Sequence, residues 1–155
     1  MTREKRSVAF WVVSVFLVLA VAVLLLGQTS ALVAYDFAVA LGLQESVDDV
    51  GPFGVEVNRA FGASDTFVYI PLMVAALIGL VRRRRWALPM AAAAMGISVY
   101  WAVTIAAMKL FLGGVPGYSL VPGPDYWVFL GIFIVIGTWG VFYIAVRGDR
   151  LMGGA

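Results

Sequence analysis

Four consecutive arginines, Arg82, Arg83, Arg84 and Arg85, interrupt this chain between two long stretches that carry no charge. Placing one arginine at the centre of a lipid bilayer costs about 2.5 to 3.5 kcal/mol, so four adjacent ones must lie in water at a membrane surface. The apolar stretches on either side are therefore predicted to form a helical hairpin with the arginines at its bend. Because basic residues are enriched in cytoplasmic loops, we expect this bend to face the cytoplasm.

The composition is that of an integral membrane protein. Hydrophobic residues make up 63% of the 155 residues and charged residues 13%, whereas a soluble domain is about 25% charged. We predict an all-α, polytopic protein: an antiparallel four-transmembrane-helix bundle in a single membrane domain, residues 1–155. The predicted spans are residues 8–28, 65–81, 86–112 and 126–146, joined by a cytoplasmic hinge at 82–85, a larger first extracytoplasmic loop at 29–64 and a second at 113–125.

The charges are divided between the two predicted sides of the membrane. The basic residues at the predicted cytoplasmic ends are Arg3, Lys5, Arg6, Arg82 to Arg85, Arg147 and Arg150. The acidic residues on the predicted outer side are Asp36, Glu45, Asp48, Asp49, Glu56, Asp65 and Asp125. This division predicts a multi-pass protein of the cell (inner) membrane with both termini cytoplasmic, and it accounts for the net charge of +2 without a nucleic-acid partner. The arginine run is alternatively a contact for anionic lipid or a protein partner.

The first apolar stretch, residues 8–28, has two interpretations. A basic leader followed by apolar residues is typical of a secretory signal peptide, and the small residues Thr29, Ser30 and Ala31 fit a cleavage site. The stretch is longer than the 7 to 15 or so apolar residues of a signal peptide, which favours a retained span. The shorter apolar stretch 31–43 is expected to extend this helix or to form an interfacial helix.

The chain has no cysteine and no histidine. Their absence excludes disulfides, thiol redox chemistry, zinc sites of the Cys/His type and catalytic triads with a histidine base. We therefore expect no cofactor and no metal. Carboxylates, tyrosines, Lys109 and Arg59 remain as candidates for chemistry or binding.

Small residues recur on the last three predicted spans, where they would allow helices to approach closely. Two pairs have the four-residue spacing of one helix face, and three further glycines occur on the fourth span. The residues concerned are Ala75 and Gly79, Ala92 and Gly96, and Gly131, Gly137 and Gly140.

Two ionisable residues, Asp65 and Lys109, are predicted to lie at or near membrane depth, where such groups are by default candidates for function. If the second and third helices are antiparallel about the arginine hinge, positions whose numbers add up to about 167 lie level. Asp65 is then level with Ala102 and within a turn of Trp101. In one interpretation Asp65 caps its helix. Lys109 then extends to the outer interface, or pairs with Asp65, Glu56 or Asp125.

In the other interpretation the outer half of the bundle holds an outward-facing polar pocket for a ligand. Tyrosine, tryptophan and threonine would form its floor, charged residues its rim, and the two outer loops its cover. The predicted floor residues are Tyr69, Tyr100, Trp101 and Thr104, and the predicted rim residues are Asp65, Arg59 and Lys109.

The architecture resembles that of lipoprotein signal peptidase, which also has four spans and a large first outer loop. That family carries an aspartate signature around its last two spans, and Asp125 is the only acid in the corresponding part of this chain. We therefore expect a non-catalytic accessory or assembly subunit, or a homo-oligomeric bundle, in contact with lipid and with a membrane-protein partner. The alternatives are a binder or transporter of a small lipophilic or cationic molecule, and a membrane-embedded enzyme that uses Asp65.

Overall fold

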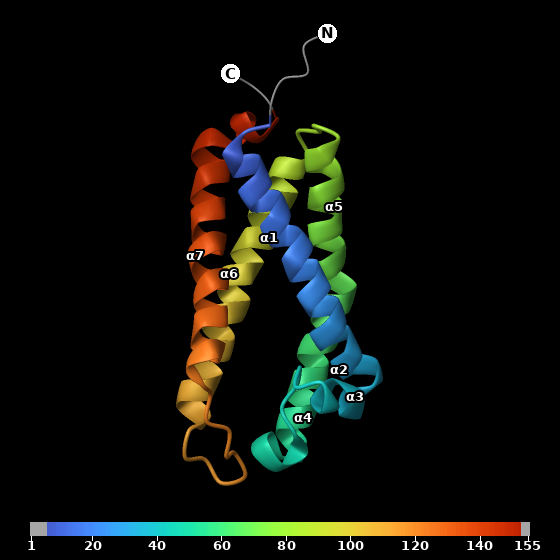
Figure 1. Ribbon diagram of the computed structural model, residues 1–155, viewed down its shortest axis with the longest axis vertical. Helices are drawn as coiled ribbons and strands as arrows, with labels where there is room; N and C mark the ends of the chain where they lie inside the picture. The colour runs from blue at the N-terminus through green and yellow to red at the C-terminus, as the bar shows by residue number, and fades with distance from the viewer. Residues whose placement is uncertain (1–5, 153–155) are drawn as a thin grey trace.

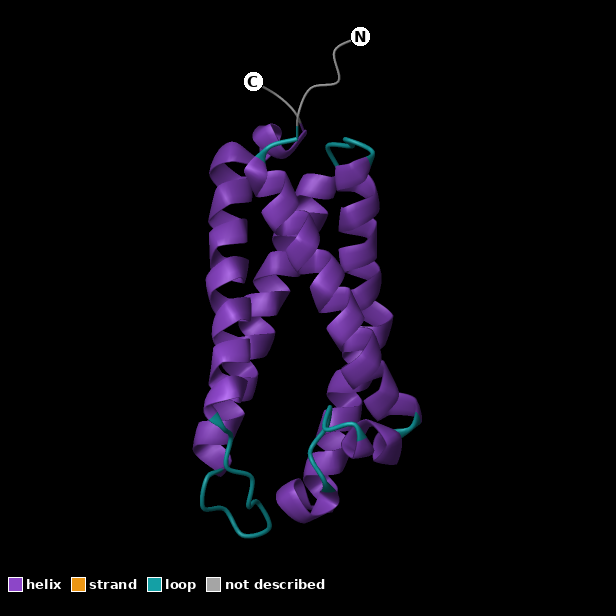
Figure 2. Ribbon diagram, in the orientation of Figure 1, coloured by secondary structure: helices purple, strands orange, loops and turns teal. Residues whose placement is uncertain are grey.

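The computed structural model describes residues 6–152, and every regular element within them is a helix (Figures 1 and 2). Four of these helices are long and apolar enough to cross a membrane: Val8–Val33, Val47–Val81, Ala87–Leu112 and Pro124–Met152. They run alternately up and down along the long axis of the molecule (Figure 1). The all-helical fold with four apolar helices agrees with the prediction. Arg3 and Lys5 lie outside the described residues.

The first long helix combines α1 (Val8–Leu24), a π-helical turn η1 (Leu25–Thr29) and α2 (Ser30–Val33). It begins at Ser7, whose side chain accepts a hydrogen bond from the backbone N–H of Phe10 at 3.2 Å, the usual arrangement of an N-cap. A separate short helix, α3 (Tyr35–Ala40), follows. The first residues of the stretch 31–43 therefore extend the first helix, as one of the two predictions stated. Residues 35–40 form a separate short helix.

The second long helix begins much earlier than predicted, because residues 47–63 are helical rather than a loop. It combines α4 (Val47–Ser64), a second π-helical turn η2 (Asp65–Tyr69) and α5 (Ile70–Val81). A capping box between Ser46 and Asp49 starts α4. Gly51, with φ +69°, bends the chain just before Pro52.

Asp65 is consequently not a helix cap. The helix continues through it without a break, with Asp65 in the first position of η2. Pro71 comes two residues after η2 and has no backbone N–H to donate to the preceding turn. A π-helical turn therefore directly precedes the segment that contains this proline.

The hairpin between α5 and α6 (Ala87–Leu112) closes with backbone and side-chain hydrogen bonds. Arg83 has φ +52°, and the N–H of Arg84 donates to the carbonyl of Gly79 at 2.8 Å, a common way to end a helix. The guanidinium of Arg6 donates to the carbonyls of Leu80 at 3.1 Å and Val81 at 2.7 Å. It thereby adds hydrogen bonds to the last carbonyls of α5, where helical partners run out, and the Leu80 carbonyl also accepts from the N–H of Arg83 at 3.2 Å.

The hairpin lies at the same end of the molecule as the start of α1 and the 3-10 helix η3 (Gly148–Met152) that follows α7 (Pro124–Arg147) (Figure 1). Arg85 and Asp149 form an exposed ion pair there, at 3.8 Å. We call this the arginine end. The opposite, acidic end holds α3, the start of α4 and the loop 113–123 (Figure 1).

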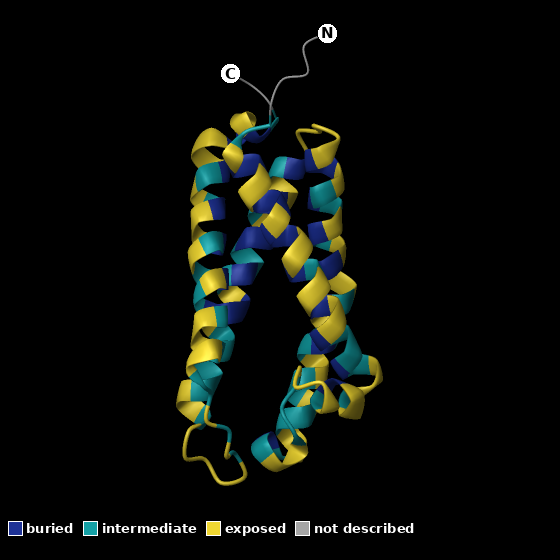
Figure 3. Cartoon of the chain, viewed as in Figure 1, coloured by how far each residue is buried: buried dark blue, intermediate teal, exposed yellow. Residues whose placement is uncertain are grey.

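Buried residues gather in the half of the molecule next to the arginine end (Figure 3). All four long helices contribute to this core, and α6 packs against both α5 and α7. Its fully buried side chains include Val13 and Leu17 of α1, Met73, Ala76 and Leu80 of α5, Ala87, Ala91, Ala94 and Met95 of α6, and Leu151 of η3. Towards the acidic end the pair α6 and α7 diverges from α1 and α4 (Figure 3).

Two of the predicted small residues allow α6 and α7 to approach closely. A Cβ added at Gly137 would lie 2.9 Å from the carbonyl oxygen of Met95, and one at Gly140 would lie 2.9 Å from the Met95 side chain. Gly96 and Gly131 have open space in the same position. The prediction of close packing is therefore confirmed for Gly137 and Gly140 and wrong for Gly96 and Gly131.

Candidate functional site

A cavity of about 430 Å³ lies in the acidic half, between the diverging helices. Residues from α1, α4, α6, α7 and the connecting segments line it, and most of them are apolar. Phe53, whose side chain is 83% exposed, belongs to the lining, so the cavity communicates with the surroundings. The lining residues used below are Val23, Gln28, Glu45, Val57, Asn58, Trp101, Ile105, Met108, Lys109, Leu112, Tyr118, Tyr126 and Phe129.

The strongest polar contact in the cavity joins Lys109 of α6 to Glu45, which precedes α4. Lys109 Nζ lies 2.5 Å from Glu45 Oε1, and the two side chains are only 8% and 17% exposed. The ammonium group also lies 5.6 Å from the ring centre of Tyr118 and 5.5 Å from that of Tyr126, within the range of cation–π attraction. The ion pair therefore connects the two diverging halves of the bundle.

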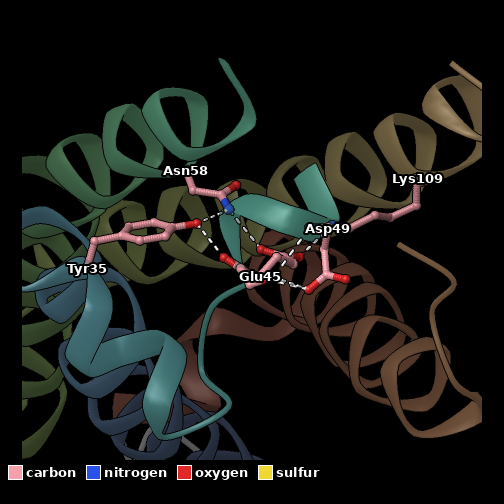
Figure 4. Close-up of polar contacts among 6 residues, drawn as sticks. Tyr35, Glu45, Asp49, Asn58 and Lys109 are labelled. Carbon is pink, nitrogen blue, oxygen red and sulfur yellow. Dashed lines mark hydrogen bonds and ion pairs between the residues drawn. The ribbon is translucent and has the colours of Figure 1, made fainter. Parts of the chain in front are cut away.

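Glu45 is held in place by two further side chains (Figure 4). Asn58 Nδ2 donates to Glu45 Oε2 at 2.8 Å and lies 2.9 Å from the hydroxyl oxygen of Tyr35. The Tyr35 hydroxyl donates to the backbone carbonyl of Glu45 at 2.8 Å. Burial raises the pKa of the Tyr35 hydroxyl above its usual value of 10.0, and the nearby Glu45 carboxylate acts in the same direction. Tyr35 therefore remains a neutral donor at physiological pH.

The start of α4 and the loop 113–123 meet beside this cavity. Ser119 donates from its backbone N–H to the carbonyl of Asp49 at 2.8 Å, and from its hydroxyl to the carbonyl of Asp48 at 3.1 Å. Its neighbour Tyr118 lines the cavity. The structure thus brings together the acidic segment and the glycine- and proline-rich loop that were expected to cover the pocket.

Trp101 and Phe129 form the part of the lining nearest the core. Their rings meet edge to face with centres 6.2 Å apart, and both rings also contact Phe133. Asp65 lies beside Trp101 and is only 4% exposed. Within residues 6–152, neither Asp65 Oδ2 nor Trp101 Nε1 completes a hydrogen bond. Asp65 is therefore a buried carboxyl group next to the cavity lining but not part of it.

The predicted register between the second and third helices is confirmed by the hydrogen bond between Tyr69 and Ser98, whose numbers 69 and 98 add up to 167. At this level the two π-helical turns also touch. The hydroxyls of Thr29 in η1 and Thr66 in η2 lie 2.9 Å apart. A Cβ added at Gly62 would lie 2.5 Å from the carbonyl oxygen of Gln28, so the two backbones are in direct contact.

Of the predicted pocket residues, the structure brings Trp101 and Lys109 to the cavity. Tyr69 is buried against Ser98, Tyr100 is 69% exposed, and Thr104 is half-buried away from the lining. Arg59 pairs with Glu56 at 3.2 Å on the exposed face of α4. The actual partner of Lys109 is Glu45, in place of Asp65, Glu56 or Asp125.

The spacing of apolar residues on α6 indicates which face of this helix lines the cavity. Trp101, Ile105, Met108 and Leu112 all line the cavity, and their spacing of three or four residues places them on one helix face together with Lys109. No comparable pattern marks Glu45 or Asn58, because their positions depend on how α4 packs against the first helix.

The cavity lining is mostly apolar and holds one ion pair. Among residues 6–152, no three side chains of the metal-ligating types His, Cys, Asp and Glu gather together. Lys109 and Glu45 neutralise each other, and the remaining lining is aromatic or aliphatic apart from a few amides and hydroxyls. The chain matches no protein family, no curated protein and no solved structure with which it was compared.

Proposed function

We propose that this protein spans the inner membrane four times and binds a lipophilic molecule with a polar group in the cavity of its acidic half. The observation that supports this proposal is the cavity itself, which combines apolar walls with the buried pair Lys109 and Glu45. Ligand sites in proteins commonly have this character: a mostly apolar concavity of about 300 to 1,000 Å³ with a few polar groups that orient the ligand.

The charge distribution supports the proposed orientation. The exposed arginines 82–85 lie at the arginine end, together with the start of α1 and η3 (Figure 1). By the positive-inside bias this end faces the cytoplasm, which puts both described ends of the chain there. The cavity then opens towards the outer side of the membrane.

The cavity favours a binding protein over the accessory-subunit hypothesis. The exposed apolar side chains along the helices are what a lipid environment requires, so they do not by themselves indicate a protein partner. A sealed bundle would be expected of a purely structural subunit, whereas these helices diverge around an open cavity.

Native mass spectrometry after purification in a mild detergent tests this function. We expect the wild-type protein to retain a small molecule, since each buried methylene contributes about 0.8 kcal/mol to binding. Ile105→Trp should project an indole into the cavity, obstruct the ligand and strongly reduce retention. The matched control is Val135→Trp, at a position 68% exposed on the outer face of α7, which should retain the molecule. Val57→Phe obstructs the same cavity with a smaller change in volume and should also reduce retention.

Two results would contradict the proposal. In the first, the wild-type protein retains no small molecule, and Ile105→Trp and Val57→Phe do not change the binding of added lipid. In the second, a stoichiometric partner protein occupies the cavity in place of a small molecule.

A further inference from the structure

An apolar groove runs along the outside of the bundle between α1 and α7. It has a volume of about 510 Å³ and is lined only by aliphatic and aromatic side chains. Its lining residues are Trp11, Val12, Val15, Phe16, Leu19, Ala20 and Val23 of α1, and Phe129, Ile132, Phe133 and Ile136 of α7. Several of these side chains are strongly exposed, among them Leu19 at 60% and Val15 at 51%.

The groove and the cavity are neighbours. Val23 of α1 and Phe129 of α7 line both of them. The two spaces differ in chemistry, because the cavity holds the ion pair of Lys109 whereas the groove along α1 is apolar. A molecule that fills both must have a charged head and a long hydrocarbon tail.

We propose that the occupant is a zwitterionic phospholipid of the outer leaflet, with a phosphate and a primary amine in its headgroup. This inference rests on the proposed function and names the class of ligand. The headgroup lies in the cavity, one acyl chain lies in the groove, and the second chain remains in the surrounding bilayer.

The charges in the cavity select this headgroup. Lys109 and Glu45 form a single ammonium–carboxylate pair with a net charge of zero. When a zwitterionic headgroup enters, its phosphate pairs with Lys109 and its amine pairs with Glu45, so every buried charge keeps a partner. A headgroup that carries only a phosphate leaves Glu45 facing a like charge, which is costly in a partly buried site. Tyr118 and Tyr126 supply hydroxyls and ring faces beside the ammonium.

The dimensions of the groove also fit a lipid. From Trp11 to Val23 is twelve helical residues, or about 18 Å at 1.5 Å per residue. A chain in this groove runs from the cavity towards the arginine end, parallel to α1. The groove begins at Val23 beside the cavity and ends at Trp11, three residues after the start of α1, so a tail in it extends past the middle of the first long helix.

Titration of the delipidated protein with defined lipids, followed by native mass spectrometry, tests the inference. The probes are phosphatidylethanolamine and phosphatidylglycerol with identical chains, and dihexanoyl phosphatidylethanolamine, which has the same headgroup but short chains. We expect long-chain phosphatidylethanolamine to bind about tenfold more tightly than phosphatidylglycerol, as expected for one additional charged hydrogen bond. Glu45→Gln should remove this preference.

The groove is tested separately. Ile132→Trp should weaken binding of long-chain phosphatidylethanolamine and leave binding of the dihexanoyl lipid unchanged, because only the long chain reaches the groove. Val128→Trp is the matched control on α7, since Val128 is 63% exposed and lines neither space. Gel filtration of each variant shows whether it is folded.

The outcomes distinguish this inference from the proposed function. If Ile105→Trp strongly reduces binding of every lipid but the two headgroups bind equally, the cavity binds a ligand and the zwitterionic assignment is wrong. Equal effects of Ile132→Trp on long and short chains overturn the assignment of the groove. If Ile105→Trp changes the binding of none of these lipids, the inference fails together with the proposed function.

Discussion

The two halves of this bundle are held together by different forces. Next to the arginine end, alanine and glycine residues of α6 and α7 bring the helices into direct contact around a buried apolar core. In the acidic half the helices separate, and polar contacts between Lys109 and Glu45 and between Ser119 and Asp49 connect them across the cavity. In the arginine half, apolar packing sets the arrangement of the helices. In the acidic half, polar contacts connect helices that do not pack against each other, and the cavity lies between them.

This contrast has a direct consequence for mutations. Stability should depend on side-chain volume in the arginine half and on charge in the acidic half. Each of the following substitutions tests one side of that contrast against a matched control.

The largest effect is expected from removal of one member of the buried ion pair. Lys109→Met leaves the Glu45 carboxylate largely buried without its counter-charge, and we expect a loss of about 3 to 5 kcal/mol in the free energy of unfolding. The double variant Lys109→Met with Glu45→Leu should recover most of this loss. Thermal unfolding in detergent measures both. A double variant as unstable as the single one would mean that the pair does not act as a unit.

A smaller effect is expected at the contact between α6 and α7. Gly137→Ala places a Cβ 2.9 Å from the Met95 carbonyl and should cost about 1 to 3 kcal/mol through overpacking. Gly131→Ala on the same helix meets open space and should be neutral or slightly stabilising, because alanine favours helix more than glycine does. Similar melting temperatures for the two variants would show that the helices are not tightly packed at Gly137.

The hydrogen bond between Tyr69 and Ser98 should contribute less to the free energy of unfolding than the packing at Gly137 does. Ser98→Ala leaves the buried Tyr69 hydroxyl without this partner, and we expect a loss of about 1 kcal/mol. Ser14 is the control, since its buried hydroxyl has no hydrogen-bond partner within residues 6–152. Ser14→Ala should therefore have no destabilising effect. The same thermal assay compares the two, and equal losses would contradict the role given to the Tyr69 bond.

The smallest effect is expected at the surface of the arginine end. Arg85 and Asp149 are 3.8 Å apart with side chains 87% and 76% exposed, and such pairs contribute little. Asp149→Asn should leave the melting temperature unchanged at both low and high salt. A clear, salt-sensitive decrease would show that charge also stabilises the arginine half, and the contrast between the halves would be lost.

Much of the fold followed from the sequence because hydrophobic length and charge placement are local properties. The arginine run located the hairpin, and the register derived from it placed Tyr69 opposite Ser98 and Asp65 beside Trp101. The start of the second helix was missed because the acids Asp48, Asp49 and Glu56 and the turn residues Gly51, Pro52 and Gly54 indicated a polar loop. In the structure residues 47–63 are helical, with Glu56 on the exposed side of α4 and Asn58 in the lining of the cavity.

The candidate site was harder to predict because it depends on long-range contacts. Lys109 was singled out as an ionisable group near membrane depth, but its partner Glu45 is 64 positions away along the chain. The position of Glu45 is set by Tyr35 and Asn58, whose contacts arise only once α3 and α4 have packed. No local pattern in the sequence indicates that arrangement.

The two π-helical turns affect how the acidic half of the bundle is rotated relative to the arginine half. An i→i+5 hydrogen bond encloses one residue more than an α-helical one, so each turn acts as a single-residue insertion in its helix. Deleting Thr66 would return η2 to the α-helical phase and rotate α4 by about 100° relative to α5. Asn58 would then point away from the cavity, although the arginine hairpin would be unaltered. The orientation of the cavity is thus encoded by the count of residues in two short turns, independently of their side chains.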